Sequence, residues 1–260
     1  FDSIPSDLGT FVACEYLKSH GGDACARVDG YFGKAKGGAS GGTLESILNI
    51  FSLPKREILK MTRPYYLNPR APVAIGTIPT AIGESVVSGP CPTTDVADRV
   101  GVRFDRAVNT WTMPFIMAAI NTRVVRRSAA LLEEDKRGYG PDFAYNECQS
   151  APGLTGLVAG LAVSLGTPLF VLLAFFPFTR ALLRKVIALC GLSPGEGPSR
   201  ELQRTGFFEA QFMAKAAKSP RRVLVRVKGI QDPGYAETAK MLTESALCLA
   251  LGEDVSSSGG

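Results

Sequence analysis

The feature that most limits how this chain can fold is a long stretch without charge. No charged residue occurs from Cys148 to Thr179, and most of residues 154–178 are apolar. A run of this length could cross a bilayer. Glycines and two prolines, Pro168 and Pro177, interrupt it. The run is therefore consistent with a single span, with a re-entrant or surface-lying helical hairpin, or with a buried helix or acyl-chain tunnel.

The residues that follow this run are basic, as is typical of a cytoplasmic flank: Arg180, Arg184 and Lys185. Residues 180–190 have the pattern of an interfacial amphipathic helix. We therefore expect an apolar helical insertion at about 153–190 that contacts a membrane or lipid-droplet surface through 154–178. The first residues carry no secretory signal, and the six cysteines form no CxxC motif. We expect the cytoplasmic face of a membrane or lipid droplet, and not secretion.

Composition excludes several classes of protein. The net charge of +5 comes from 29 basic and 24 acidic residues, a mild excess without interleaved aromatic residues. This pattern does not predict nucleic-acid binding. The chain has one histidine, His20. Histidine-based triads and multi-histidine metal sites are therefore not expected, and we predict no metal site.

A glycine-rich segment, KGGASGGT at residues 36–43, separates a strand-like run (26–36) from a helix-like run (44–51). A strand that feeds such a turn brings backbone N–H groups to a helix N-terminus, where an anion or polar substrate can bind. The spacing meets neither nucleotide-binding fingerprint. Alternatively, the glycines only let strand and helix pack closely. The candidate substrate-binding residues here are Gly37, Gly38, Ser40, Gly41, Gly42 and Thr43, with Thr43 as a candidate N-cap.

A long helix is predicted from Thr112 to about Asp135. Three arginines on it fall at i, i+3 and i+4 and so share a face: Arg123, Arg126 and Arg127. Together they favour a substrate phosphate or carboxylate. The alternative is a solvated face paired with the acidic residues at 133–135. The next segment, 138–148, reads as a loop, in which Tyr139 and Tyr145 are candidates for catalytic proton donors or, alternatively, packing residues.

The remaining pattern predicts an α/β fold, or an α+β substrate domain, with a mixed sheet flanked by helices. Residues 52–110 are rich in proline and show little regular pattern apart from one short helix. Further elements follow from period-2 and period-3.6 patterns: a helix within 2–17, a short helix at 55–61, a β-hairpin at 207–216 and 222–228, and a helix at 236–251.

Five blocks in register resemble the saccharopine dehydrogenase-like oxidoreductases, which include the trans-acting enoyl reductases. They are FDSIPSDLG, KGGASGGT, PFIMAAINTRVVRRS, YGPDFAYNE and VKGIQDPGYAETAKMLTESALCLAL. The resemblance implies that residues 1–19 close a dinucleotide-binding domain with the terminal helix of a Rossmann-like unit. Residues 20–260 would then form a substrate and dimerisation domain. In that family the glycine-rich nucleotide turn lies upstream, so we expect these residues to be part of a longer protein.

The resemblance also implies an NAD(P)-dependent oxidoreductase that acts on a lipid-like enoyl substrate and can form a homodimer. Asp2 and Ser3 would lie near the nicotinamide, although we do not expect this chain to bind the cofactor alone. The alternative is a non-catalytic lipid-surface or scaffold protein that keeps the fold without the cofactor domain.

Overall fold

The computed structural model describes residues 3–38, 41–69, 98–140, 142–191, 193, 195 and 197–251, and the backbone of 75–80 and 83–88. Its helices are α1 (Ile4–Gly21), α2 (Gly41–Ile50), α3 (Lys55–Met61), α4 (Ala118–Glu134), α5 (Gly153–Phe175), α6 (Pro177–Leu189), α7 (Arg200–Thr205) and α8 (Ala236–Leu251). Its strands are β1 (Cys25–Lys36), β2 (Ile75–Thr80), β3 (Gly83–Ser88), β4 (Arg103–Asp105), β5 (Thr110–Met113), β6 (Ala144–Ala151), β7 (Phe207–Ala216) and β8 (Arg222–Gly229).

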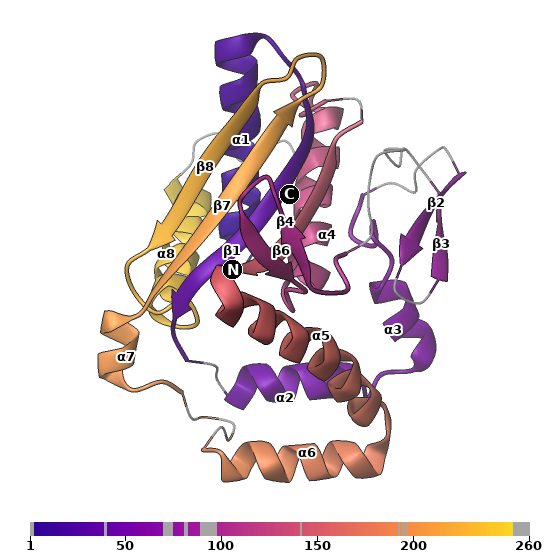
Figure 1. Cartoon of the computed structure of the whole chain (residues 1–260), viewed down its shortest axis with the longest axis vertical. Helices are drawn as coiled ribbons and strands as arrows, with labels where there is room; N and C mark the ends of the chain where they lie inside the picture. The colour runs from indigo at the N-terminus through magenta and orange to yellow at the C-terminus, as the bar shows by residue number, and fades with distance from the viewer. Residues whose placement is uncertain are drawn as a thin grey trace.

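Six strands form one mixed sheet in the order β4-β5-β6-β1-β7-β8, and β2 and β3 form a separate pair (Figure 1). The central strands β1 and β6 run parallel and pair Phe32 with Gln149 near their ends. The other neighbours in the large sheet are antiparallel. The structure therefore confirms an α/β fold with a mixed sheet flanked by helices. Because parallel neighbours end at the same edge, the segments after Phe32 and after Gln149 meet there.

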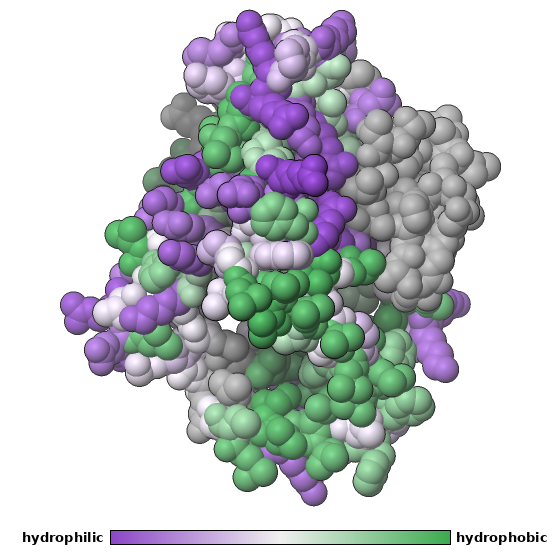
Figure 2. Space-filling model, viewed as in Figure 1, coloured by the Kyte–Doolittle hydropathy of each residue, from purple (hydrophilic) through white to green (hydrophobic). Residues whose placement is uncertain are grey.

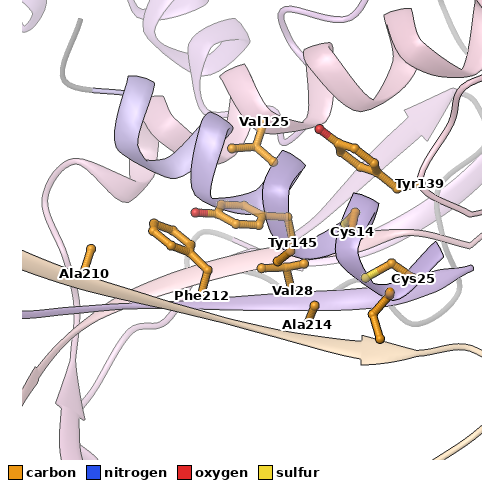
Figure 3. Packing of buried hydrophobic residues seen from close by; sticks show 11 residues of the cluster. Cys14, Cys25, Val28, Val125, Tyr139, Tyr145, Ala210, Phe212 and Ala214 are labelled. Carbon is orange, nitrogen blue, oxygen red and sulfur yellow. The ribbon is translucent and has the colours of Figure 1, made fainter. Parts of the chain in front are cut away.

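Helices α1 and α4 cover one face of this sheet, with α1 against β7 and β8 and α4 against β6. Between them lies a core of small and aromatic side chains (Figure 3). Gly9 permits this contact, since a Cβ there would come within 2.3 Å of the Phe212 ring. The first helix thus shares its core with the sheet that the rest of the chain builds. The division into domains at residue 19 stays a prediction.

The structure confirms the helix at 55–61, the hairpin of β7 and β8, and the helix at 236–251. The helix expected from Thr112 is wrong at its start, because α4 begins only at Ala118. Residues 110–113 instead form β5, which pairs Trp111 with Ala151. Pro114 has no N–H with which to extend that ladder. The loop expected through 138–148 is also wrong in part, because β6 begins at Ala144.

The apolar insertion forms two helices that break at Phe176. Gly156 and Gly160 bring α5 close to the sheet, since Cβ atoms there would meet Ala151 and Val102. Arg180 donates to the carbonyl of Phe51, and Arg184 forms an ion pair with Glu45 at 2.9 Å. These arginines therefore hold α6 against α2 and do not serve as free flanking cations.

The outer sides of α5 and α6 expose apolar side chains. Figure 2 shows hydrophobic residues gathered over the part of the molecule where Figure 1 places α5, α2 and α6. The exposed residues recur at helical spacing: Leu154, Val158, Leu161, Leu165, Leu169 and Leu172 on α5, and Phe178, Leu182, Val186 and Leu189 on α6. We call this set the apolar ridge. Among the described residues, one helix, α5, is long and apolar enough to cross a membrane, judged by length and composition alone.

Candidate functional site

A pocket of about 370 Å³ opens at the carboxyl edge of the parallel strands. Its walls are mainly apolar and come from β1, β7, the α8 region and the start of α4: Phe32, Ala35, Phe115, Met117, Phe208, Pro233 and Met241. The polar side chains that line it include Asn121, Gln149 and Glu209. Apolar walls with a few polar groups are typical of small-molecule sites, and this edge is where ligands bind in open α/β sheets.

Aromatic packing and two helix ends shape the pocket. The Phe32 and Phe115 rings stack with centroids 4.4 Å apart, and Phe212 meets Phe32 edge-on at 6.1 Å. Pro5, in the first turn of α1, and Met117, the N-cap residue of α4, both line the space. Two helix N-termini therefore face it and give it a mildly positive field.

The glycine turn lies where the sequence predicts, but its chemistry differs. Gly37 and Gly38 line the pocket. The Gly38 N–H, however, donates at 2.9 Å to a carboxylate oxygen of Asp232, which is buried. The second oxygen of Asp232 accepts from the Tyr235 N–H at 2.7 Å. A carboxylate of the chain itself therefore takes the place that an anionic ligand would occupy at Gly38.

Close approach explains the glycines here. A Cβ on Gly37 would lie 2.4 Å from Asp232 Oδ1, and one on Gly38 would lie 2.5 Å from Pro198. The alternative interpretation, that the glycines let segments pack tightly, thus has direct geometric support. Gly41 and Gly42 belong to α2, and Thr43 lies inside that helix and not at its N-cap. Ser40 lies outside the described residues.

Beneath the pocket lies a buried polar network centred on Glu147. Asn121 Nδ2 donates to Glu147 Oε1 at 2.8 Å, and the hydroxyls of Ser6 and Tyr145 donate to Oε2 at 2.9 and 2.7 Å. The Ser3 hydroxyl donates to Asn121 Oδ1 at 2.7 Å. The carboxylate is buried but has three donors, as a buried charge requires. Sequence reasoning missed Glu147 and Asn121, although a lone acid between Asn146 and Cys148 was a usable signal.

Burial raises the pKa of Glu147 to about 7, against the opposing effect of its three donors. Its carboxyl has a pKa of 4.5 in the unfolded reference. Between these values the native state binds more protons, so the free energy of unfolding falls as pH rises through about 4.5 to 7. The shift corresponds to about 3 kcal/mol. We expect Glu147→Gln to abolish this part of the pH dependence, as measured by urea unfolding of both proteins from pH 5 to 8. An unchanged slope would contradict it.

The residues predicted to bind the cofactor are Asp2 and Ser3. Asp2 lies outside the described residues. Ser3 is the N-cap residue of α1, but its side chain does not cap the helix and bonds to Asn121 instead. Ser3 therefore joins the network at the pocket, and a role toward a nicotinamide stays a prediction.

The three arginines share one face, as predicted, but that face contacts protein. Arg123 donates to the Thr62 carbonyl at 2.9 Å and pairs with Asp98 at 2.5 Å. Arg126 donates to the carbonyls of Pro64 and Tyr145, and Arg127 to that of Leu67: the distances are 3.3, 3.1 and 2.7 Å. They fasten the segment after α3 to α4. The expected anion site is therefore already filled by backbone carbonyls.

Both tyrosines named as proton-donor candidates lie in the core (Figure 3). Burial raises the pKa of Tyr139 and of Tyr145 well above the usual range, and Glu147 adds to the effect at Tyr145. Neither residue is among those that line the pocket. The structure therefore supports the alternative of packing tyrosines, with Tyr145 holding Glu147.

The fold and pocket together define an α/β domain with an apolar pocket at the carboxyl edge of its parallel strands. The sequence matches no protein-family model and no solved structure. A Mycobacterium tuberculosis protein described as a putative trans-acting enoyl reductase is 31% identical over 260 residues, 98% of this chain and 58% of that protein. A trans-acting enoyl reductase of Mycobacterium bovis is 30% identical over 271 residues with the same coverage. One of Mycobacterium leprae is 33% identical over 154 residues, 55% of this chain and 33% of that protein.

The chain is thus a homologue of proteins named trans-acting enoyl reductases over nearly all of its length. This confirms the resemblance to that group. The chain spans 58% of the length of these first two relatives. The wider saccharopine dehydrogenase-like classification stays a prediction.

Proposed function

We propose that this chain forms the substrate-binding part of an enoyl-reducing oxidoreductase and that the pocket beside Gly37 and Gly38 holds the acyl group. The observation that carries the proposal is the position of an apolar pocket at the carboxyl edge of β1 and β6, in a homologue of enoyl reductases. The walls suit a lipid-like chain, since most of the lining side chains are hydrocarbon.

A nicotinamide cofactor, NADH or NADPH, is the hydride source that the resemblance implies. Its phosphates do not fit the glycine turn, because the Asp232 carboxylate already accepts the Gly38 N–H and would repel them. At this site the chain therefore binds the acyl group and not the cofactor phosphates. We expect the 260-residue chain to bind an enoyl thioester without added cofactor.

Filling the pocket tests this assignment. Ala35→Trp places an indole in the pocket from an exposed position on β1. We expect it to weaken binding of the trans-2-decenoyl thioester of N-acetylcysteamine at least about tenfold, the equivalent of ~1.4 kcal/mol. Titration calorimetry measures the affinity. Ala217→Trp, in the turn between β7 and β8, is the matched control and should bind normally. Equal binding by all three proteins would refute the pocket assignment.

A second candidate function, with or without catalysis, is contact with a lipid surface through the apolar ridge. Ridge residues are strongly exposed, Leu165 at 73% and Phe178 at 83%. Apolar side chains gathered in one exposed patch mark interaction surfaces, including membrane contacts. Gly156 and Gly160 hold the first half of α5 against the sheet, which favours a helix pair lying on the surface over a spanning helix. The proposed location is the cytoplasmic face of a membrane or lipid droplet.

We expect the chain to sediment with phosphatidylcholine vesicles. The triple variant Leu165→Ser, Leu169→Ser and Leu172→Ser should partition into vesicles about a hundredfold less. Each leucine that inserts halfway into the lipid contributes about 1 kcal/mol to the free energy of partitioning. The matched control replaces three exposed leucines of α8 by serine: Leu242, Leu247 and Leu249. An equal loss of vesicle binding in the control would show that non-specific hydrophobic association, and not the apolar ridge, explains the binding. Sedimentation equilibrium without lipid would test the implied homodimer, which stays a prediction.

A further inference from the structure

Asn121 lies at the base of the pocket. It belongs to the first turn of α4, lines the space, and is only 1% exposed. The other amide side chain among the described lining residues, Gln149, is exposed at the rim. Glu209, also on the wall, ionises and then only accepts hydrogen bonds. Asn121 is therefore the buried side chain of this wall that can donate to a ligand.

The orientation of the Asn121 amide follows from its neighbours. Above its pKa of about 7, Glu147 is ionised and can only accept, so the group that faces it at 2.8 Å is the amide nitrogen. The amide oxygen then faces the Ser3 hydroxyl, which donates to it at 2.7 Å. Both contacts agree on the same rotamer. The amide nitrogen carries two hydrogens, and Glu147 takes one of them.

Packing alone does not explain why a carboxylate lies beside Asn121. Burying a carboxylate is costly, and an apolar side chain would stabilise this core at lower cost. Placed here, the carboxylate fixes the direction of the amide nitrogen, and the Ser3 hydroxyl that donates to the amide oxygen polarises the amide, which strengthens the second N–H as a donor. The presence of a buried charge here is thus explained if the second N–H donates to an acceptor atom of a ligand in the pocket.

We propose that Asn121 recognises the carbonyl oxygen of the bound acyl group, with Glu147 and Ser3 as the residues that position its amide. The inference rests on the proposed function, because the acyl substrate comes from it. A thioester carbonyl only accepts hydrogen bonds, and the described apolar side chains of the pocket offer it no donor. Asn121 therefore sets where along the pocket the carbonyl stops, and so which carbons lie toward the opening.

Isotope-edited infrared spectroscopy tests this directly. The probe is trans-2-decenoyl N-acetylcysteamine with a ¹³C-labelled carbonyl, bound to the 260-residue chain. We expect the labelled carbonyl stretch to move to lower frequency on binding, as hydrogen bonding requires. Asn121→Ala should remove that shift and weaken binding about 3- to 10-fold. Asn49→Ala, the same change at an exposed residue of α2 that accepts from Arg184 and does not line the pocket, should leave both unchanged.

Two further variants separate positioning from folding. Ser3→Ala keeps the amide but removes the hydroxyl that orients it, and should reduce the infrared shift without unfolding the protein. Glu147→Gln presents a donor to Asn121 and should rotate its amide, which a changed side-chain NH₂ resonance would report. If the shift persists in folded Asn121→Ala, the inference is wrong while the pocket assignment stands. If wild type does not bind the probe, the proposed function fails with it.

Discussion

Replacing Asp232 by alanine is expected to lower the free energy of unfolding by about 4 kcal/mol. The buried carboxylate accepts from the N–H groups of Gly38 and Tyr235, at 2.9 and 2.7 Å. Hydrogen bonds to a charged group contribute about 1.5–3 kcal/mol each. The loss should also release the glycine turn from the turn that leads into α8, and so widen the pocket. Urea unfolding measures the first effect, and amide hydrogen exchange at Gly38 and Tyr235 measures the second.

Two further variants test whether the Asp232 carboxylate itself is responsible for this loss of stability. Asp232→Asn keeps one acceptor oxygen but sets an NH₂ group against the other N–H, so we expect about half to all of the loss. Asp135→Ala removes an exposed carboxylate whose ion pair with Arg137 is solvated, and should change stability by less than about 0.5 kcal/mol. If Asp232→Ala is as stable as Asp135→Ala, the carboxylate does not hold the turn.

The glycine turn shows what the sequence could and could not predict. The strand falls where the pattern puts it, the helix begins three residues earlier than expected, at Gly41, and Gly37 and Gly38 do line a pocket. The use of the Gly38 N–H was not predictable, because its acceptor lies 194 residues further along the chain. Local spacing predicts that a backbone N–H is available. Only the tertiary fold decides whether a ligand or the chain itself takes it.

The strands β5 and β6 were missed for a related reason. The residues of β6, Ala144–Ala151, lack a clear alternation of apolar and polar positions, and β5, Thr110–Met113, alternates but is only four residues long. β6 lies between β5 and β1, so its residues are buried by sheet neighbours and helices. A strand in that position can carry Asn146 and Glu147, provided that hydrogen bonds satisfy them. By contrast, the two-stranded hairpin of β7 and β8 alternates clearly because one of its faces is solvated.

The arginine face of α4 leads to the second prediction with a large effect. Arg126 is 4% exposed, donates to the carbonyls of Pro64 and Tyr145, and lies 5.2 Å from the Tyr65 ring centroid. Arg126→Met preserves much of the shape but leaves two buried carbonyls without this donor. We expect a loss of about 3–5 kcal/mol in the free energy of unfolding. Urea unfolding checks the magnitude.

Because Arg126 contacts Pro64 and Tyr65 in the segment after α3, the loss should be accompanied by faster hydrogen exchange in residues 62–69. Arg137→Met, at an exposed arginine beyond the end of α4, is the matched control and should unfold like wild type. The opposite result would be a stable Arg126→Met protein that has lost affinity for anionic acyl ligands. That outcome would restore the anion-binding interpretation of this face, and would show that the carbonyl contacts contribute little to stability.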